Sequence, residues 1–96
     1  MVTHIVMWKL KEENKAENAR EMKKRLDAIN DLIPGLKRLE VSTNILVSDP
    51  ETDIALFSQF DTLEDLKTYA EHPRHLEVVA FIKSVAAERR VVDYEL

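Results

Sequence analysis

The chain contains no cysteine, a single glycine and no long apolar run. The absence of cysteine excludes a disulfide framework, a thiol nucleophile and a cysteine-based zinc site. One glycine excludes a glycine-rich phosphate loop and a dinucleotide-binding fingerprint, because each of these motifs needs several. The apolar runs are too short to cross a membrane, and the N-terminus lacks the pattern of a signal peptide. These absences predict a soluble, cytoplasmic protein with no membrane partner.

Positive charge is also scarce, since 14 Lys and Arg residues face 18 Asp and Glu residues. The formal net charge is −4 and the pI is about 5.3. Nucleic acid is therefore not expected as a partner, because phosphate backbones attract basic surfaces. A length of 96 residues suits one folding unit, and no repeat or linker divides it. We expect one domain over residues 1–96.

The order of the patterned segments predicts an α+β fold. Segments rich in β-branched and aromatic residues predict strands at 3–10, 36–46, 54–60 and 89–95. Apolar residues at spacings of three and four predict helices at 16–32, from a cap near 62 to 71, and at 74–87. The resulting β-α-β-β-α-β order is the ferredoxin-like arrangement, with a four-stranded antiparallel sheet and its helices on one face.

The helix boundaries carry signals of their own. Asn14 begins an Asn-x-x-Glu pattern that resembles a capping box, in which the Asn side chain bonds the first turn. Asp61 or Thr62 is expected to cap the second helix. The Pro34-Gly35 pair ends the first helix, because proline cannot continue it and glycine tolerates a left-handed turn. Pro73 divides the second helical segment.

Two of the predicted strands are apolar on both faces, although helices can cover only one. The face that the helices leave uncovered would carry Ile5, Met7, Ala55 and Phe57. A second copy of the chain could cover this face and place two sheets against each other. The alternative is an ordinary exposed patch, but large apolar patches are uncommon on monomers. The pattern therefore predicts a homodimer through the sheet face, paired as a dimeric α/β barrel.

The residues that could carry chemistry are His4, Tyr69, His75 and Asp93. His4 and His75 fall within apolar patterns, so both imidazoles are expected to point into the layer between helices and sheet. A buried carboxylate needs a partner, so Asp93 is expected to pair with either His75 or His4. Tyr69 lies six residues before His75, across the proline corner, and could converge on the same pocket.

A carboxylate-oriented imidazole is a competent general base near neutral pH. A tyrosine hydroxyl beside it could donate a hydrogen bond to a substrate carbonyl as charge develops there. In a second interpretation, the histidines are polar core residues with satisfied hydrogen bonds. In a third, His72 and His75 bind a metal at i, i+3 spacing, although the sequence offers no defined third ligand. We expect neither a metal nor a cofactor.

Motifs spread over the whole chain are similar to those of one family. They are the His-Ile-Val-Met-Trp-Lys-Leu run at 4–10, Ile-Pro-Gly-Leu at 33–36, Tyr-x-x-His-Pro-x-His at 69–75 and Val-Val-Asp-Tyr at 91–94. Together they resemble the stress-responsive A/B barrel domain (Dabb) family. The resemblance implies a homodimeric barrel of ferredoxin-like subunits and an association with stress responses.

The best understood relative in that family, olivetolic acid cyclase, performs an aldol condensation on a polyketide without a cofactor. The resemblance places His75 at the position of its catalytic His and Tyr69 at that of its Tyr. His4 and Asp93 match polar residues of the same pocket. It thus implies a small-molecule ligand and a cofactor-free cyclase or isomerase. A non-catalytic stress-associated or ligand-binding dimer is the alternative, and a cofactor-free monooxygenase is a more distant one.

Overall fold

The computed structural model describes residues 1–96 and contains one sheet and three helices. The elements are β1 (Val2–Leu10), α1 (Lys15–Ala28), β2 (Leu36–Ser42), β3 (Ile54–Phe60), α2 (Leu63–Glu71), α3 (Pro73–Val85) and β4 (Ala86–Glu95). The strand order is β2-β3-β1-β4, and all neighbours are antiparallel. The predicted ferredoxin-like fold is confirmed. None of its helices has both the length and the hydropathy of a membrane span.

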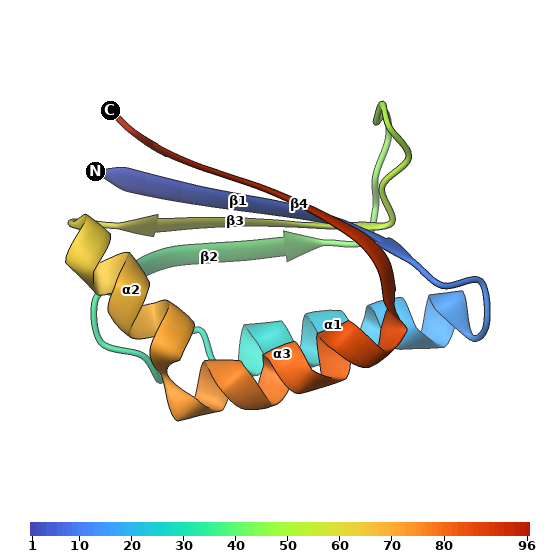
Figure 1. The fold of residues 1–96 in the computed structure, drawn as a ribbon, viewed down its shortest axis with the longest axis horizontal. Coiled ribbons are helices and arrows are strands. Elements are labelled where there is room, and N and C mark those ends of the chain that lie inside the picture. Colours follow the sequence, from blue (N-terminus) through green and yellow to red (C-terminus); the bar gives the residue numbers. More distant parts are fainter.

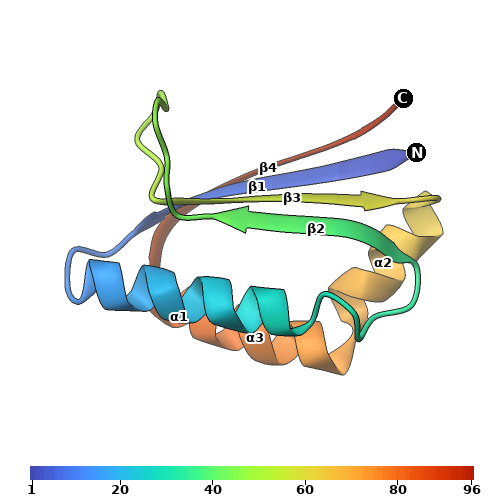
Figure 2. The ribbon, with the colours of Figure 1, turned by 180° about the vertical axis from the view of Figure 1, so that it is seen from behind.

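The helices pack on one face of the sheet, and the other face has no covering layer (Figures 1 and 2). Period-two alternation explains which side chains enter the core. In β3, Ile54, Leu56, Ser58 and Phe60 are buried, whereas the alternating residues Ala55, Phe57 and Gln59 are only half-buried. The apolar stripe of α1 supplies Met22 and Leu26 to the same core. One core therefore fills the layer between sheet and helices, as the sequence predicts.

The first helix ends at Ala28, a turn before the predicted end at residue 32. After it the backbone tightens, and the Ile29 amide donates to the Leu26 carbonyl, three residues back, at 3.2 Å. Ile29 and Ile33 nevertheless stay buried in the core. The predicted apolar stripe is right, and only its last turn is not α-helical.

One predicted cap is wrong and one is confirmed. Asn14 has a left-handed backbone (φ 53°), and its side chain makes no capping hydrogen bond. A capping box needs an extended backbone at that position, so the Asn-x-x-Glu pattern does not form one. At α2, the Thr62 hydroxyl accepts a hydrogen bond from the Asp65 amide at 3.1 Å, as predicted.

The second strand is shorter than predicted and stops at Ser42, which pairs with Ala55 near the start of β3. Beyond that point no strand lies opposite, because Asp53 bonds to β1 instead. Its amide donates to the Trp8 carbonyl at 2.8 Å, and its carboxylate accepts from the Leu10 amide at 2.8 Å. Residues 43–53 therefore form a loop, which rises past the uncovered face of the sheet (Figure 1).

The C-terminal boundary also differs, since α3 ends at Val85 and β4 follows directly from Ala86. The predicted helix ran two residues further and the predicted strand began at residue 89. At the other end of the helix layer, the single glycine occupies a position that needs it. Gly35 has φ +87°, and a Cβ there would lie 2.9 Å from the Cγ atom of Asp65. This close approach fixes the turn between α1 and β2 against the start of α2.

Candidate functional site

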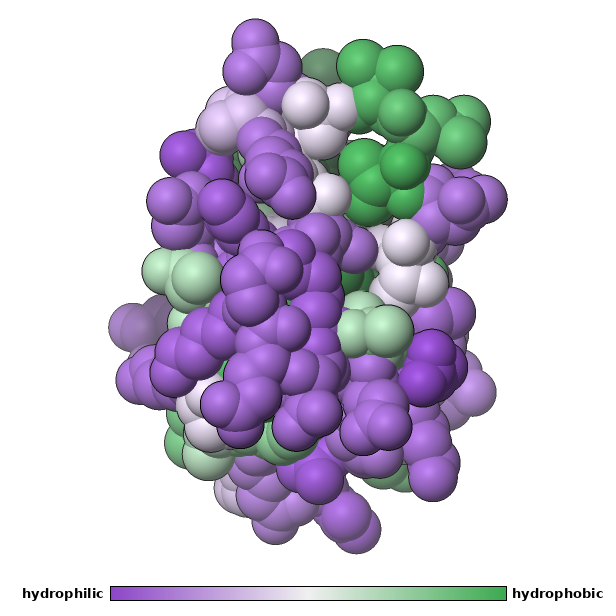
Figure 3. Space-filling view, turned by 90° about the vertical axis from the view of Figure 1, so that its right-hand side faces the viewer, coloured by the Kyte–Doolittle hydropathy of each residue, from purple (hydrophilic) through white to green (hydrophobic).

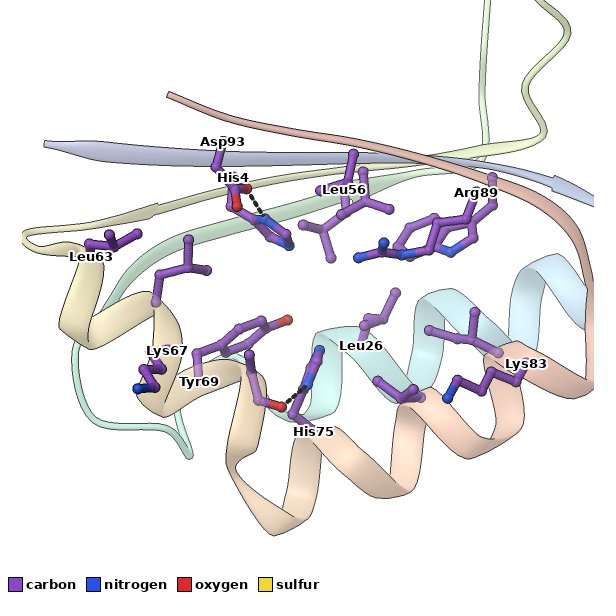
Figure 4. Close-up of a pocket in the computed structure, with 17 residues that line it drawn as sticks. His4, Leu26, Leu56, Leu63, Lys67, Tyr69, His75, Lys83, Arg89 and Asp93 are labelled. Atoms are coloured by element: carbon purple, nitrogen blue, oxygen red, sulfur yellow. Dashed lines mark hydrogen bonds and ion pairs between the residues drawn. The ribbon is translucent and has the colours of Figure 1, made fainter. Parts of the chain in front are cut away.

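A cavity of about 600 Å³ lies between the sheet and the helices (Figure 4). Hydrophobic residues make up 11 of the 17 that line it. The four predicted site residues, His4, Tyr69, His75 and Asp93, all line this one cavity. A mostly apolar cavity with a few converging polar groups is the usual form of a small-molecule site.

His4 and Asp93 lie directly opposite each other on β1 and β4. The His4 Nδ1 atom is hydrogen-bonded to the Asp93 carboxylate. Because a carboxylate accepts, Nδ1 carries the proton, and the Nε2 atom is left to face the cavity (Figure 4). Of the two partners that the sequence allowed for Asp93, the structure selects His4. The Asp93 side chain is 44% exposed, so it lies at the rim of the cavity.

His75 is oriented by a different group. Its Nδ1 atom lies 3.1 Å from the Ala70 carbonyl oxygen, which can only accept. Nδ1 therefore donates, and the lone pair of Nε2 is directed into the cavity (Figure 4). The alternative in which Asp93 orients this ring is wrong, because the helix corner brings a backbone carbonyl to its Nδ1 atom instead.

Burial lowers the pKa of His75 below its ordinary value of 6.5. The bond to the Ala70 carbonyl opposes this shift, whereas the neighbouring charges of His4 and Arg89 add to it. Its imidazole is therefore neutral at pH 7, with one nitrogen free to accept a proton.

Tyr69 stands beside His75 in the last turn of α2 and is only 1% exposed. Its ring centroid lies 4.3 Å from that of His75 and 5.3 Å from that of Phe60. The hydroxyl has no hydrogen-bond partner in the protein, and burial raises its pKa to about 12. It stays protonated, as a donor without an acceptor. All three histidines have a hydrogen-bond partner at Nδ1, as the second interpretation expects, whereas the buried Tyr69 hydroxyl has none.

The third histidine has a structural task. His72 ends α2 and caps α3, and its Nδ1 atom accepts a hydrogen bond from the Arg74 amide at 3.1 Å. Pro73 then occupies the first helical position, where its missing amide hydrogen costs little. No group of three or more His, Asp or Glu side chains is arranged to hold a metal ion.

Three features of the cavity wall are not predicted from the sequence. Arg89 faces Trp8 across β1 and β4, and its guanidinium points into the cavity (Figure 4). The Trp8 Nε1 donor is buried and has no partner. Lys67 and Lys83 line the cavity from α2 and α3. Strand parity could have found Arg89, because it shares a face with Val91 and Asp93.

The fold defines a ferredoxin-like α+β domain with a mostly apolar cavity between its sheet and its helices. The chain belongs to the Dabb family: the model of the Stress Responsive A/B Barrel Domain matches residues 2–96. The resemblance seen in the sequence is thereby confirmed. No curated protein matches the chain.

Solved structures share the fold over nearly the whole chain. A dimeric ferredoxin-like protein of unknown function from Bacteroides fragilis is 34% identical, with TM-score 0.86, over 99% of this chain and 95% of that one. Hydroxynitrile lyase from Passiflora edulis is 17% identical, with TM-score 0.83, over 99% of this chain and 92% of that enzyme. A protein named as a candidate antibiotic biosynthesis monooxygenase from Nitrosomonas europaea is 21% identical, with TM-score 0.74, over 100% of this chain and 98% of that protein. The relation to olivetolic acid cyclase stays a prediction.

Proposed function

We propose that this chain forms a homodimer that binds a small molecule between helices and sheet and catalyses a proton transfer on it without a cofactor. His75 acts as the general base, and Tyr69 donates a hydrogen bond to a carbonyl oxygen of the substrate. His4 and Asp93 form the polar wall opposite. A cyclisation or an isomerisation through an enolate could be catalysed by this base and this hydrogen-bond donor.

The observation that carries the proposal is the unpartnered Tyr69 hydroxyl next to an imidazole with a fixed tautomer. A buried donor without an acceptor is costly, and a ligand oxygen would supply the acceptor. As a proton leaves the adjacent carbon, charge develops on that oxygen, and a preorganised donor stabilises it. The neutral His75 ring has a free nitrogen to take the proton.

The hydroxynitrile lyase with the same fold is consistent with this reaction class. Cleavage of a hydroxynitrile to a carbonyl compound and cyanide also needs a base to remove a proton, here from the hydroxyl group that becomes the carbonyl. At 17% identity the likeness concerns the fold, so the substrate of that enzyme is only a probe for this chain.

The catalytic role can be measured with two probes. Deuterium uptake next to the carbonyl of benzylacetone is followed by NMR in D₂O, and cleavage of mandelonitrile by absorbance. We expect the wild type to accelerate at least one reaction, and His75→Ala to lower that rate by about 10²–10⁴-fold. Tyr69→Phe should lower it by about 10²–10³-fold. His72→Asn, which keeps a capping side chain outside the cavity, is the matched control and should retain the rate.

The pH profile provides a second readout. Because burial lowers the pKa of His75, its base form persists below pH 6.5, and the rate should fall on the acid side with a midpoint below that value. A protein that binds both probes and turns over neither would contradict the catalytic proposal. That result would favour the alternative, a ligand-binding dimer without catalysis, which the mostly apolar lining of the cavity also suits.

A cofactor-free monooxygenase is the third candidate, and it rests on the Nitrosomonas neighbour of the same fold. Oxygen consumption in the presence of an enolisable ligand separates it from the proton-transfer reaction, which consumes none.

The homodimer is proposed through the uncovered face of the sheet. Ile5, Met7, Ala55 and Phe57 lie on this face and are only half-buried in the single chain. The Bacteroides fragilis protein, which shares 34% of its residues with this chain, is dimeric. Two such faces packed together would give an aligned sheet-on-sheet barrel and remove this apolar surface from water.

A further inference from the structure

Arg89 is a cation without a partner above an apolar cavity. It forms no ion pair, although nine pairs connect other charged side chains of the protein. Lys67 and Lys83, the other two cations of the cavity wall, are also unpaired. Half of the 14 Lys and Arg side chains form an ion pair, so a missing partner is not unusual in itself. The cavity wall, however, carries three of the unpaired cations and a single carboxylate, whereas in the whole chain acidic residues outnumber basic ones by 18 to 14.

The single carboxylate of the cavity does not cancel this charge. Asp93 accepts a hydrogen bond from His4 and makes no ion pair with Arg89. Arg89 also acts on the interior of the cavity, since its charge contributes to the lowered pKa of His75.

The polar groups divide between two parts of the cavity. Arg89 and Lys83 lie toward the end where β4 follows α3, and the His4, Tyr69 and His75 side chains lie nearer its centre (Figure 4). The buried Trp8 Nε1 donor belongs to the first group, because Trp8 is the cross-strand partner of Arg89. Lys67 is at the opposite end, and its ammonium group is turned away from the cavity (Figure 4).

We infer that the ligand is an amphipathic monoanion, whose carboxylate binds Arg89 and whose apolar body fills the cavity beside Tyr69 and His75. An arginine fork binds a carboxylate through two parallel hydrogen bonds, and Trp8 can donate a further one. A volume of about 600 Å³ accommodates a chain of eight carbons with room to spare. This inference rests on the proposed ligand pocket and not on its catalytic role.

Fluorescence of the single tryptophan is a built-in probe, because Trp8 lines the cavity. Octanoate, octanol and octylammonium have the same chain and differ in charge. We expect octanoate to change the emission of the wild type with a Kd about tenfold or more below that of octanol, and octylammonium to bind more weakly than either. Calorimetry provides the affinities independently of the fluorescence.

Arg89→Gln should weaken octanoate binding about tenfold and leave octanol binding unchanged. Arg20→Gln, which removes an exposed and unpaired arginine from α1, is the matched control and should change neither. Should Arg89→Gln not fold, salt provides the same comparison in the wild type. Raising ionic strength from about 0.05 M to about 0.5 M should weaken octanoate binding and leave octanol binding unchanged.

Equal affinities for octanoate and octanol would overturn the anion inference and leave the pocket standing. If none of the three compounds binds by either method, the ligand pocket itself fails, and the proposed function fails with it. Loss of turnover in His75→Ala with octanoate binding intact would support both proposals separately.

Discussion

At the scale of single residues, the ring and the hydroxyl of Tyr69 have opposite effects on the stability of the fold. Its ring packs on Phe60 and His75 and fills the core, while its hydroxyl is buried without a partner. The ring stabilises the domain, and the unpaired donor lowers that stability. Such a local conflict is typical of functional positions.

Tyr69→Phe should therefore keep the free energy of unfolding in urea at pH 7 or raise it by about 0–1 kcal/mol. The pKa of Tyr69 is about 12 in the folded protein and 10 in the unfolded chain, so folding favours the protonated form. This contribution is complete below pH 10 and is lost as the pH rises toward 12. The wild type should lose stability relative to Tyr69→Phe over that window. A loss of several kcal/mol at pH 7 would instead indicate that the hydroxyl has a structural partner.

The sequence predicts which side chains reach the cavity but not how they pair. Strand alternation and helix spacing place His4, Tyr69, His75 and Asp93 toward one layer, and the structure brings all four to one cavity. The choice of His4 as the partner of Asp93 depends on the register between β1 and β4, which joins residues 89 positions apart. Arg89 belongs to the same register. Local patterns contain no information about such long-range alignment.

At the scale of elements, the corner between α2 and α3 fixes the site. His72 is at once the C-cap of α2 and the N-cap of α3, and the helix axis changes direction there (Figure 1). Tyr69 lies before the corner and His75 after it, and their rings face each other across the bend. The angle of this corner therefore sets the distance between the proposed base and the proposed donor.

His72→Ala removes the acceptor for the Arg74 amide and should lower the free energy of unfolding by about 1 kcal/mol. His72→Asn offers a side-chain oxygen to the same amide and should retain most of the free energy of unfolding that the cap contributes. Urea unfolding of the two variants measures the difference. Equal stabilities would show that the cap contributes nothing and that Pro73 alone directs the corner.

Element types could be predicted from the sequence better than element ends. The periods of two and 3.6 residues define seven elements, and all seven are present. The ends depend on groups far away in the chain. β2 stops at Ser42 because Asp53 is bound to β1, and Asn14 takes a left-handed turn instead of capping. A local propensity cannot anticipate either, since tertiary contacts decide them.

At the scale of the whole molecule, the sheet divides a covered half from an uncovered one. The loop of residues 43–53 projects beyond the uncovered face, and its Leu46 and Val47 are 87% and 92% exposed. Figure 3, which looks onto the end that bears this loop, shows hydrophobic atoms gathered at the top of the molecule. In the proposed dimer, this loop would reach along the edge of the partner sheet and bury these side chains.

Light scattering should therefore give twice the chain mass of 11.1 kDa. Replacing both Leu46 and Val47 by serine should raise the dimer dissociation constant by tenfold or more, because each buried side chain contributes about 1.5–3 kcal/mol. Leu32→Ser, at an exposed leucine behind the helix layer, is the control and should change nothing. A wild type that is monomeric at micromolar concentration would refute the dimer and, with it, the role of the loop.

One strand belongs to both halves of the molecule. The inner face of β4 carries Arg89 and Asp93 into the cavity, and its outer face carries Arg90, Val92 and Tyr94 toward the proposed partner. It is an edge strand, held in the sheet by β1 alone. A ligand that stabilises β4 from the cavity side would thus strengthen dimerisation through its outer face. Dimerisation would tighten ligand binding by the same factor, since thermodynamic coupling is reciprocal. Ligand binding and dimerisation would then be one coupled equilibrium, and β4 would be the strand that takes part in both.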